Sequence, residues 1–136
     1  MARTNLPITN IAANGIVLNS GGTAIDQANG MNIALTSTGI PVVGSADRLL
    51  IYVQNTAAAT KTVTIRAGVG GGATAGAAFR SGLGDLVTGN LSATTGTAFI
   101  GALDISRFAQ LDGSINIDFS AGTTGTIWAL LLQRWN

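Results

Sequence analysis

The chain has 136 residues, a length that suits one domain, and a net charge of +1 with charged residues at 10% of the sequence, against roughly a quarter in an ordinary soluble domain. It contains no glutamate and a single lysine, Lys61, so it lacks the residues that usually cover exposed helix surfaces. The scattered arginines form no basic stripe, which argues against nucleic acid binding, and the longest apolar run, Ile127 to Leu132, is far shorter than the ~20 residues that a membrane-spanning helix needs.

Residues 1–45 are rich in glycine, asparagine, threonine and alanine, and turn-forming pairs such as Asn14-Gly15 and Asn29-Gly30 interrupt them. Short extended segments are predicted between these turns, at residues 6–12, 16–18 and 31–36. The interruptions favour an extended N-terminal arm with peripheral strands over an independent domain. Such an arm would lie on a partner surface, and deleting residues 2–20 would leave the rest of the chain folded.

Residues 46–136 show the two-residue alternation of apolar and polar side chains that is typical of half-buried strands. The predicted strands are residues 49–54, 62–67, 85–92, 97–103, 114–119 and 126–134. Residues 104–108 could form one helical turn. Ile127 to Leu132 is apolar on both faces, which indicates a central strand or a strand whose outer face meets a partner. The pattern predicts an all-β fold, a single β-sandwich or jelly-roll-like domain with its core in residues 46–136.

Catalytic chemistry finds little support in the residue types. Histidine and cysteine are both absent, which removes the commonest general base and the most reactive nucleophile. A pair of carboxylates could in principle act as acid and base, but most of the aspartates follow or precede turns, where they cap backbone amides. These aspartates are Asp26, Asp47, Asp85, Asp104, Asp112 and Asp118. The sequence therefore predicts no catalytic residues.

Cofactor and metal sites are likewise not predicted. Gly68 to Ala73 matches a relaxed dinucleotide-binding pattern, but that site needs a βαβ unit with a helix directly after the glycines. The following residues start a helix poorly, and the next strand is expected to be antiparallel. Asp112 to Asp118 places oxygens at alternate positions, as in a calcium loop, yet on a strand they would not converge on one ion.

Three segments resemble the decoration (cement) proteins that coat tailed-phage heads. The first runs from Val53-Gln54-Asn55-Thr56 to Val63-Thr64-Ile65-Arg66-Ala67-Gly68, and the second is Ala78-Phe79-Arg80-Ser81-Gly82-Leu83-Gly84-Asp85-Leu86. The third joins Gly101-Ala102-Leu103-Asp104, Ser106-Arg107-Phe108 and Asp112-Gly113-Ser114-Ile115. The resemblance covers about residues 48–134. In one respect the chain departs from the pattern, because Gly76-Ala77-Ala78 stands where relatives tend to have prolines.

The resemblance implies a structural virion protein on the capsid exterior, often a homotrimer, that binds the major capsid protein and reinforces the shell. Candidate subunit or capsid contacts are the residues of its Phe-Arg and Arg-Phe pairs and the two tryptophans of the C-terminal region. They are Phe79, Arg80, Arg107, Phe108, Trp128 and Trp135. No cofactor is implied.

Two other functions stay open at this point. A tail- or spike-associated module that binds host glycan would have the same fold, and Tyr52, Trp128 and Trp135 could supply its sugar-stacking rings. A small hydrolase would need clustered aspartates in a deep pocket.

Overall fold

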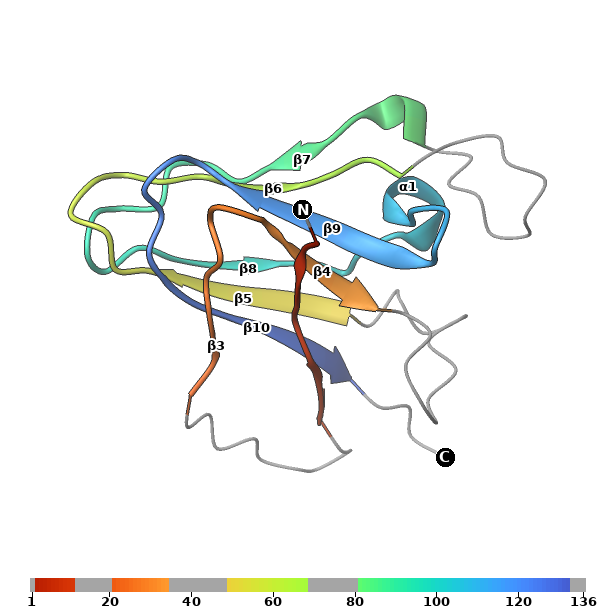
Figure 1. Ribbon diagram of the computed structural model, residues 1–136, viewed down its shortest axis with the longest axis horizontal. Coiled ribbons are helices and arrows are strands. Elements are labelled where there is room, and N and C mark those ends of the chain that lie inside the picture. The colour runs from red at the N-terminus through yellow and green to blue at the C-terminus, as the bar shows by residue number, and fades with distance from the viewer. Residues whose placement is uncertain (1, 12–20, 35–48, 69–80, 133–136) are drawn as a thin grey trace.

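The computed structural model describes residues 2–11, 21–34, 49–68 and 81–132, which form two packed β-sheets (Figure 1). The strands are β1 (Thr4–Asn5), β2 (Ile8–Ile11), β3 (Thr23–Ala24), β4 (Met31–Ala34), β5 (Leu49–Asn55), β6 (Val63–Ile65), β7 (Leu86–Val87), β8 (Thr97–Ile100), β9 (Ser114–Phe119) and β10 (Gly125–Leu132). A 3₁₀ turn, η2 (Ser81–Leu83), and one short helix, α1 (Ile105–Phe108), complete the described elements. The prediction of a β-sandwich is confirmed at this level.

Each sheet is named here after its central strand. The β9 sheet has the order β1-β4-β9-β6-β7, and the β10 sheet has the order β2-β10-β5-β8. Strand β3 also pairs with β10, at Ile127 and Thr126, and therefore shares one edge of β10 with β2. Both sheets are mixed, because β1 pairs with β4, and β2 with β10, in parallel. In Figure 1 the β9 sheet forms the upper layer and the β10 sheet the lower one.

The core lies between the two sheets and follows the alternation in the sequence. Strand β5 buries Leu49, Ile51 and Val53, while the residues between them stay partly exposed. Strand β9 buries Ile115, Ile117 and Phe119, and β10 buries Ile127, Ala129 and Leu131. Burying each large aliphatic side chain contributes about 1.5–3 kcal/mol, so these three strands account for much of the stabilisation.

Consecutive strands β5 and β6 lie in different sheets, and the loop between them crosses the sandwich. Asn55, fully buried, fixes this loop: its side-chain amide donates to the carbonyl oxygens of Ala59 (3.1 Å) and Ser92 (2.9 Å). Its side-chain oxygen accepts the Ala57 N–H at 3.0 Å. Because a buried amide is tolerated only when it is hydrogen-bonded, Asn55 ties the loop to the connection between β7 and β8.

Most predicted strands are found, three of them with shorter limits, whereas the 49–54 strand extends to Asn55. Residues 114–119 are confirmed as predicted, residues 104–108 contain the predicted helical turn, and the 97–103 strand ends at Ile100. The 85–92 segment supplies only β7 and an isolated bridge between Leu91 and Lys61. Residues 12, 16–18, 35, 36, 133 and 134 of other predicted strands lie outside the described residues.

The described part of the N-terminal segment joins both sheets. The backbone N–H of Thr4 donates to Gly30 (3.1 Å) and that of Leu6 to Asn32 (2.8 Å), which attaches β1 to the β9 sheet. Leu6 is only 1% exposed, and two residues later β2 begins at Ile8, which pairs with Ala129 of the β10 sheet. Residues 2–11 and 21–34 are thus integrated in the sandwich, and an extended arm is not shown by them.

A hydrogen-bonded aspartate holds this segment in place. The Asp26 carboxylate accepts the Thr4 hydroxyl at 2.6 Å and, from Asn29, the backbone N–H at 3.1 Å and the side-chain amide at 3.0 Å. The Thr4 hydrogen bond is the largest cause that lowers the pKa of Asp26 from 3.8 to about 2, followed by those from Asn29. The folded state therefore favours the ionised carboxylate.

Stability should fall as the pH drops from about 4 to about 2. The folded pKa of Asp26 lies below the unfolded value, so its contribution is complete above pH 3.8 and is lost as the pH falls through about 2. Thermal unfolding of wild type and of Asp26→Asn across this pH range checks this expectation. Hydrogen bonds from Ser114 also lower the pKa of Asp112, but Asp112 is present in both proteins, so the difference between them reports on Asp26. The difference in melting temperature should shrink at low pH. Parallel curves would contradict the assignment.

Candidate binding surface

The outer faces of the two sheets differ in charge. On the β9 sheet, Asp118 of β9 pairs with Arg3 and with Arg66, whose Nε lies 3.4 Å from the carboxylate. Arg66 also contacts Asp85, with its Nη1 2.8 Å from the carboxylate. None of the five described strands of the β10 sheet contains a charged residue. A charged group buried against a partner without compensation is costly, so the β10 sheet has the face better suited to contact.

A row of three aromatic side chains crosses the outer face of the β10 sheet. Trp128 of β10 lies opposite Tyr52 of β5, and Tyr52 lies opposite Phe99 of β8. The ring centroids are 5.1 Å apart for Tyr52 and Trp128 and 4.6 Å apart for Tyr52 and Phe99, with tilts of 34° and 33°. In the next outward-facing pair Leu50 lies opposite Leu130. We call Leu50, Tyr52, Phe99, Trp128, Leu130 and Leu132 the apolar face.

The rings cover one another, which limits what the apolar face can bind. Centroids this close at a shallow tilt are those of offset stacking, so the faces of Tyr52 are used by its two neighbours. A side chain on Gly22 would overlap the Trp128 ring, so the backbone of Gly22 lies against that ring. Phe99, 72% exposed, ends the row with one ring face free.

The predicted contact residues are placed differently from one another. Trp128 belongs to the apolar face, whereas Phe108 is 3% exposed and part of the core. Arg107 lies over the Phe108 ring, 4.8 Å from its centroid, and donates to the carbonyl oxygens of Gly84 (3.0 Å) and Asp85 (3.1 Å). Arg107 thus holds the loop before β7 against α1. Phe79, Arg80 and Trp135 lie outside the described residues.

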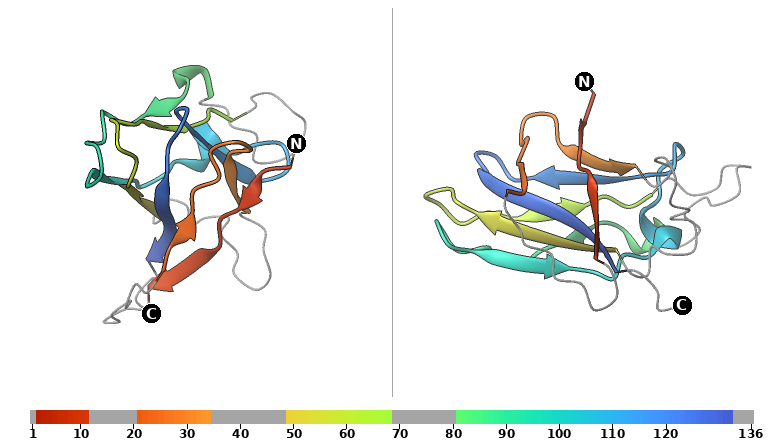
Figure 2. Two further views of the ribbon diagram at one scale, coloured as in Figure 1. Left: turned by 60° about the vertical axis from the view of Figure 1, so that its left-hand side comes forward. Right: turned by 90° about the horizontal axis from the view of Figure 1, so that it is seen from below.

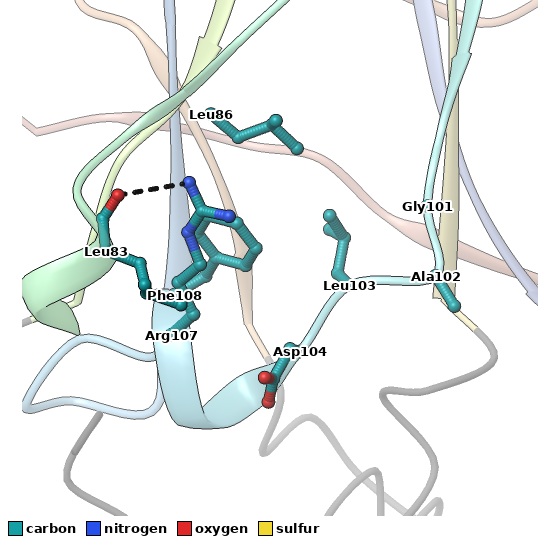
Figure 3. A pocket seen from close by; sticks show the side chains of 8 residues that line it. All are labelled: Leu83, Leu86, Gly101, Ala102, Leu103, Asp104, Arg107 and Phe108. Carbon is teal, nitrogen blue, oxygen red and sulfur yellow. Dashed lines mark hydrogen bonds between the residues drawn. The ribbon is translucent and has the colours of Figure 1, made fainter. Parts of the chain in front are cut away.

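A partly open pocket of about 250 Å³ lies beside α1 (Figure 3). Its residues are Leu83, Leu86, Gly101, Ala102, Leu103, Asp104, Arg107 and Phe108. The charged side chains here already have structural partners: Arg107 bonds the loop carbonyls, and Asp104 accepts the Ser106 N–H (2.8 Å) and hydroxyl (2.6 Å) at the start of α1. The pocket is smaller than the ~300–1,000 Å³ typical of small-molecule sites.

Asp112 and Asp118 have structural partners as well. Asp112 accepts the Ser114 N–H (2.9 Å) and hydroxyl (2.6 Å), while Asp118 faces Arg3 and Arg66, so the two carboxylates of the calcium-like pattern serve different contacts. Over residues 2–11, 21–34, 49–68 and 81–132, no group of three or more acidic, histidine or cysteine side chains could hold a metal ion.

Of the glycine-rich segment, only Gly68 is described, and its N–H donates to Arg107 (2.7 Å). The flanking strands β6 and β7 are antiparallel, as predicted, rather than the parallel pair of a βαβ unit.

Phe99 is the aromatic member of the apolar face that was not singled out from the sequence. Tyr52 and Trp128 were singled out as aromatic residues, but Phe99 stands in a short strand next to buried Ile100 and resembles a core residue. Its place in the polar phase of the alternation, between Ala98 and Ile100, was the available signal.

Comparison of the chain with protein-family models, with curated proteins and with solved structures finds no match. Within the part of the chain that the structure describes, no helix has the length and apolar character needed to cross a bilayer.

Proposed function

We propose that the protein is a non-enzymatic structural module that binds the exterior of a phage capsid, with the major capsid protein as its partner. The observation that carries the proposal is the contrast between the two sheets: charges on the β9 sheet, and an uncharged apolar face on the β10 sheet. The three segments that resemble decoration proteins supply the kind of partner.

We infer further that the sandwich is a jelly roll. Of the eight strands β3 to β10, the first, third, sixth and eighth belong to the β10 sheet, and the others to the β9 sheet. Their orders, β3-β10-β5-β8 and β4-β9-β6-β7, contain antiparallel pairs throughout. This winding supports two interlocked Greek keys, the arrangement of a jelly roll. The parallel strands β1 and β2 are then additions at its margins.

The grip on the capsid is assigned to the apolar face rather than to an N-terminal arm, because residues 2–11 contribute strands. An uncharged contact gains little from long-range attraction, which salt screens within about 10 Å. Its free energy comes from burying apolar area, at about 25 cal/mol per Å². We therefore expect binding to be strong only where the shapes fit, and to depend weakly on salt.

Capsid binding should change less than about twofold between 50 and 500 mM NaCl, since the contact contains no ion pairs. Leu132→Lys, at a position 39% exposed on the apolar face, should weaken it at least about tenfold because the new charge loses its hydration. The matched control is Val87→Lys, 55% exposed on the β9 sheet, which should bind like wild type. Co-sedimentation with purified capsids measures all three. A steep loss with salt, or normal binding by Leu132→Lys, would refute the proposal.

Glycan binding by a tail or spike module is the second candidate, favoured by the aromatic row. Sugars stack on ring faces, and Phe99, 72% exposed, is the one exposed ring of this row, whereas Tyr52 and Trp128 are half-buried. The row can therefore offer one stacking position, which suits a terminal sugar better than an extended chain. Saturable binding of a sugar that Phe99→Ala abolishes would favour this function over the first.

A further inference from the structure

Strand β8 forms an open margin of the β10 sheet. In the described part of the chain it pairs with β5 alone, and Figure 2, right, shows it at the edge of its layer. Its sequence, Thr-Ala-Phe-Ile, contains neither a charge nor a proline, the two devices that usually protect sheet edges from pairing. The neighbouring margin of the other sheet, β7, has only two residues.

The backbone groups that face outward from β8 follow from its register. Asn55 donates to the Gly96 carbonyl oxygen at 2.7 Å, which makes Asn55 and Gly96 a hydrogen-bonded pair. Hydrogen-bonded and non-bonded pairs alternate along antiparallel strands, so Ala98 and Ile100 direct their N–H and C=O groups at β5. Thr97 and Phe99 consequently direct theirs away from the sheet.

We propose that β8 pairs antiparallel with β8 of a second copy, about a two-fold axis at Ala98. Thr97 of each copy then lies opposite Phe99 of the other, and the outward backbone groups of both residues find partners. The two Phe99 side chains become diagonal neighbours, a spacing of about 7–8 Å that aromatic side chains can bridge. The free ring face at the end of each aromatic row is thereby covered, and the two β10 sheets continue as one.

A second copy fits this edge better than an unrelated chain. A two-fold contact requires a self-complementary surface. When two copies of β8 pair in this register, the outward N–H groups of each copy face the outward C=O groups of the other, and no like charges meet. A two-fold contact also closes after two copies, so it predicts a dimer where the resemblance implies a trimer. The contact is small beside the ~800 Å² per partner of a standard interface, and we expect a dissociation constant of about 1–100 µM.

The test uses the full chain, without capsids, in sedimentation and amide hydrogen exchange. Wild type should pass from monomer to dimer between about 1 and 100 µM, and the amides of Thr97 and Phe99 should gain protection as the dimer forms. Phe99→Lys should raise the dissociation constant at least about tenfold, because it places two like charges beside the axis and removes apolar contact. Its matched control is Leu111→Lys, at a position 59% exposed in the turn before β9, which should dimerise like wild type.

A second variant removes only a hydrogen-bond donor. Thr97→Pro deletes an outward N–H that does not bond β5, a position where edge strands tolerate proline, and it should also weaken the dimer at least about tenfold. Circular dichroism verifies that each variant stays folded. A wild-type monomer at 100 µM, a trimer, or a dimer that Phe99→Lys leaves intact would overturn the proposal, and none of these results bears on capsid binding.

Discussion

Deletion of residues 2–11 is expected to unfold the sandwich. The deletion removes β1 and β2, one from each sheet, and leaves the edge of β10 at Ala129 to Leu132 without its parallel partner. It also removes Leu6, which is 1% exposed, and truncating a buried leucine alone costs about 2–5 kcal/mol. Domains of this size have a total stability of about 5–15 kcal/mol, so the combined loss should approach or exceed it.

Circular dichroism and urea titration of the deletion variant measure this effect. Leu6→Ala should lower the free energy of unfolding by about 2–5 kcal/mol. The matched control Asn5→Ala, at an exposed neighbouring residue, should change it by less than about 0.5 kcal/mol. A deletion variant with the melting temperature of wild type would show that the segment is dispensable, as the arm hypothesis requires.

Gly125→Ala is expected to destabilise the protein by about 3–5 kcal/mol, the sum of backbone strain and overpacking. Gly125 begins β10 at a φ of +142°, a conformation that side chains disfavour. A Cβ atom there would overlap the backbone carbonyl oxygen of Gln54, which cannot move without disturbing β5. The Gly125 carbonyl oxygen also accepts the Ile25 N–H at 3.1 Å, so displacement would loosen the connection after β3.

Gly122→Ala provides the matched control for Gly125→Ala. Gly122 lies in the turn before β10 at a φ of +72°, but the nearest atom to its added Cβ is Nζ of Lys61 at 3.2 Å, the end of a flexible side chain. The cost there should be about 1–2 kcal/mol, from conformation alone. Urea unfolding of both variants gives the comparison. Equal losses of unfolding free energy in the two variants would mean that the contact with Gln54 does not contribute to the destabilisation.

The strands with strict alternation could be predicted from the sequence, and the assignment of strands to sheets could not. The alternation of apolar and polar residues in 49–54 and in 114–119 predicts one buried face for each strand, because successive side chains of a strand point to opposite sides. That pattern is the same for either sheet, so it did not indicate that β5 and β6 lie in different sheets. Strands β1 and β2 are too short to show a period, and Leu6, which lies between them, is the one buried side chain of residues 2–11.

The candidate site was predictable in part, for a similar reason. Tyr52 and Trp128 attract attention as large aromatic residues, and the structure brings them together with Phe99, which was not singled out from the sequence. Arg107 and Phe108 look equally suited to a partner, but the arginine donates to its own chain and the phenylalanine is buried. Composition cannot distinguish an arginine that is available to bind another protein from one that already donates hydrogen bonds to carbonyl groups of its own chain.

The central place of β10 has a kinetic consequence. Residues 125–132 join β2, β3 and β5 into one sheet, although these three strands are made far earlier in synthesis. Until β10 leaves the ribosome, β5 lacks its longest partner and residues 8–11 have no strand to join. Distant pairings of this kind slow folding, because the loops between them must close first. The β10 sheet therefore assembles only after residues 125–132 are free, and the uncharged strands β5 and β8 stay exposed to other chains during that interval.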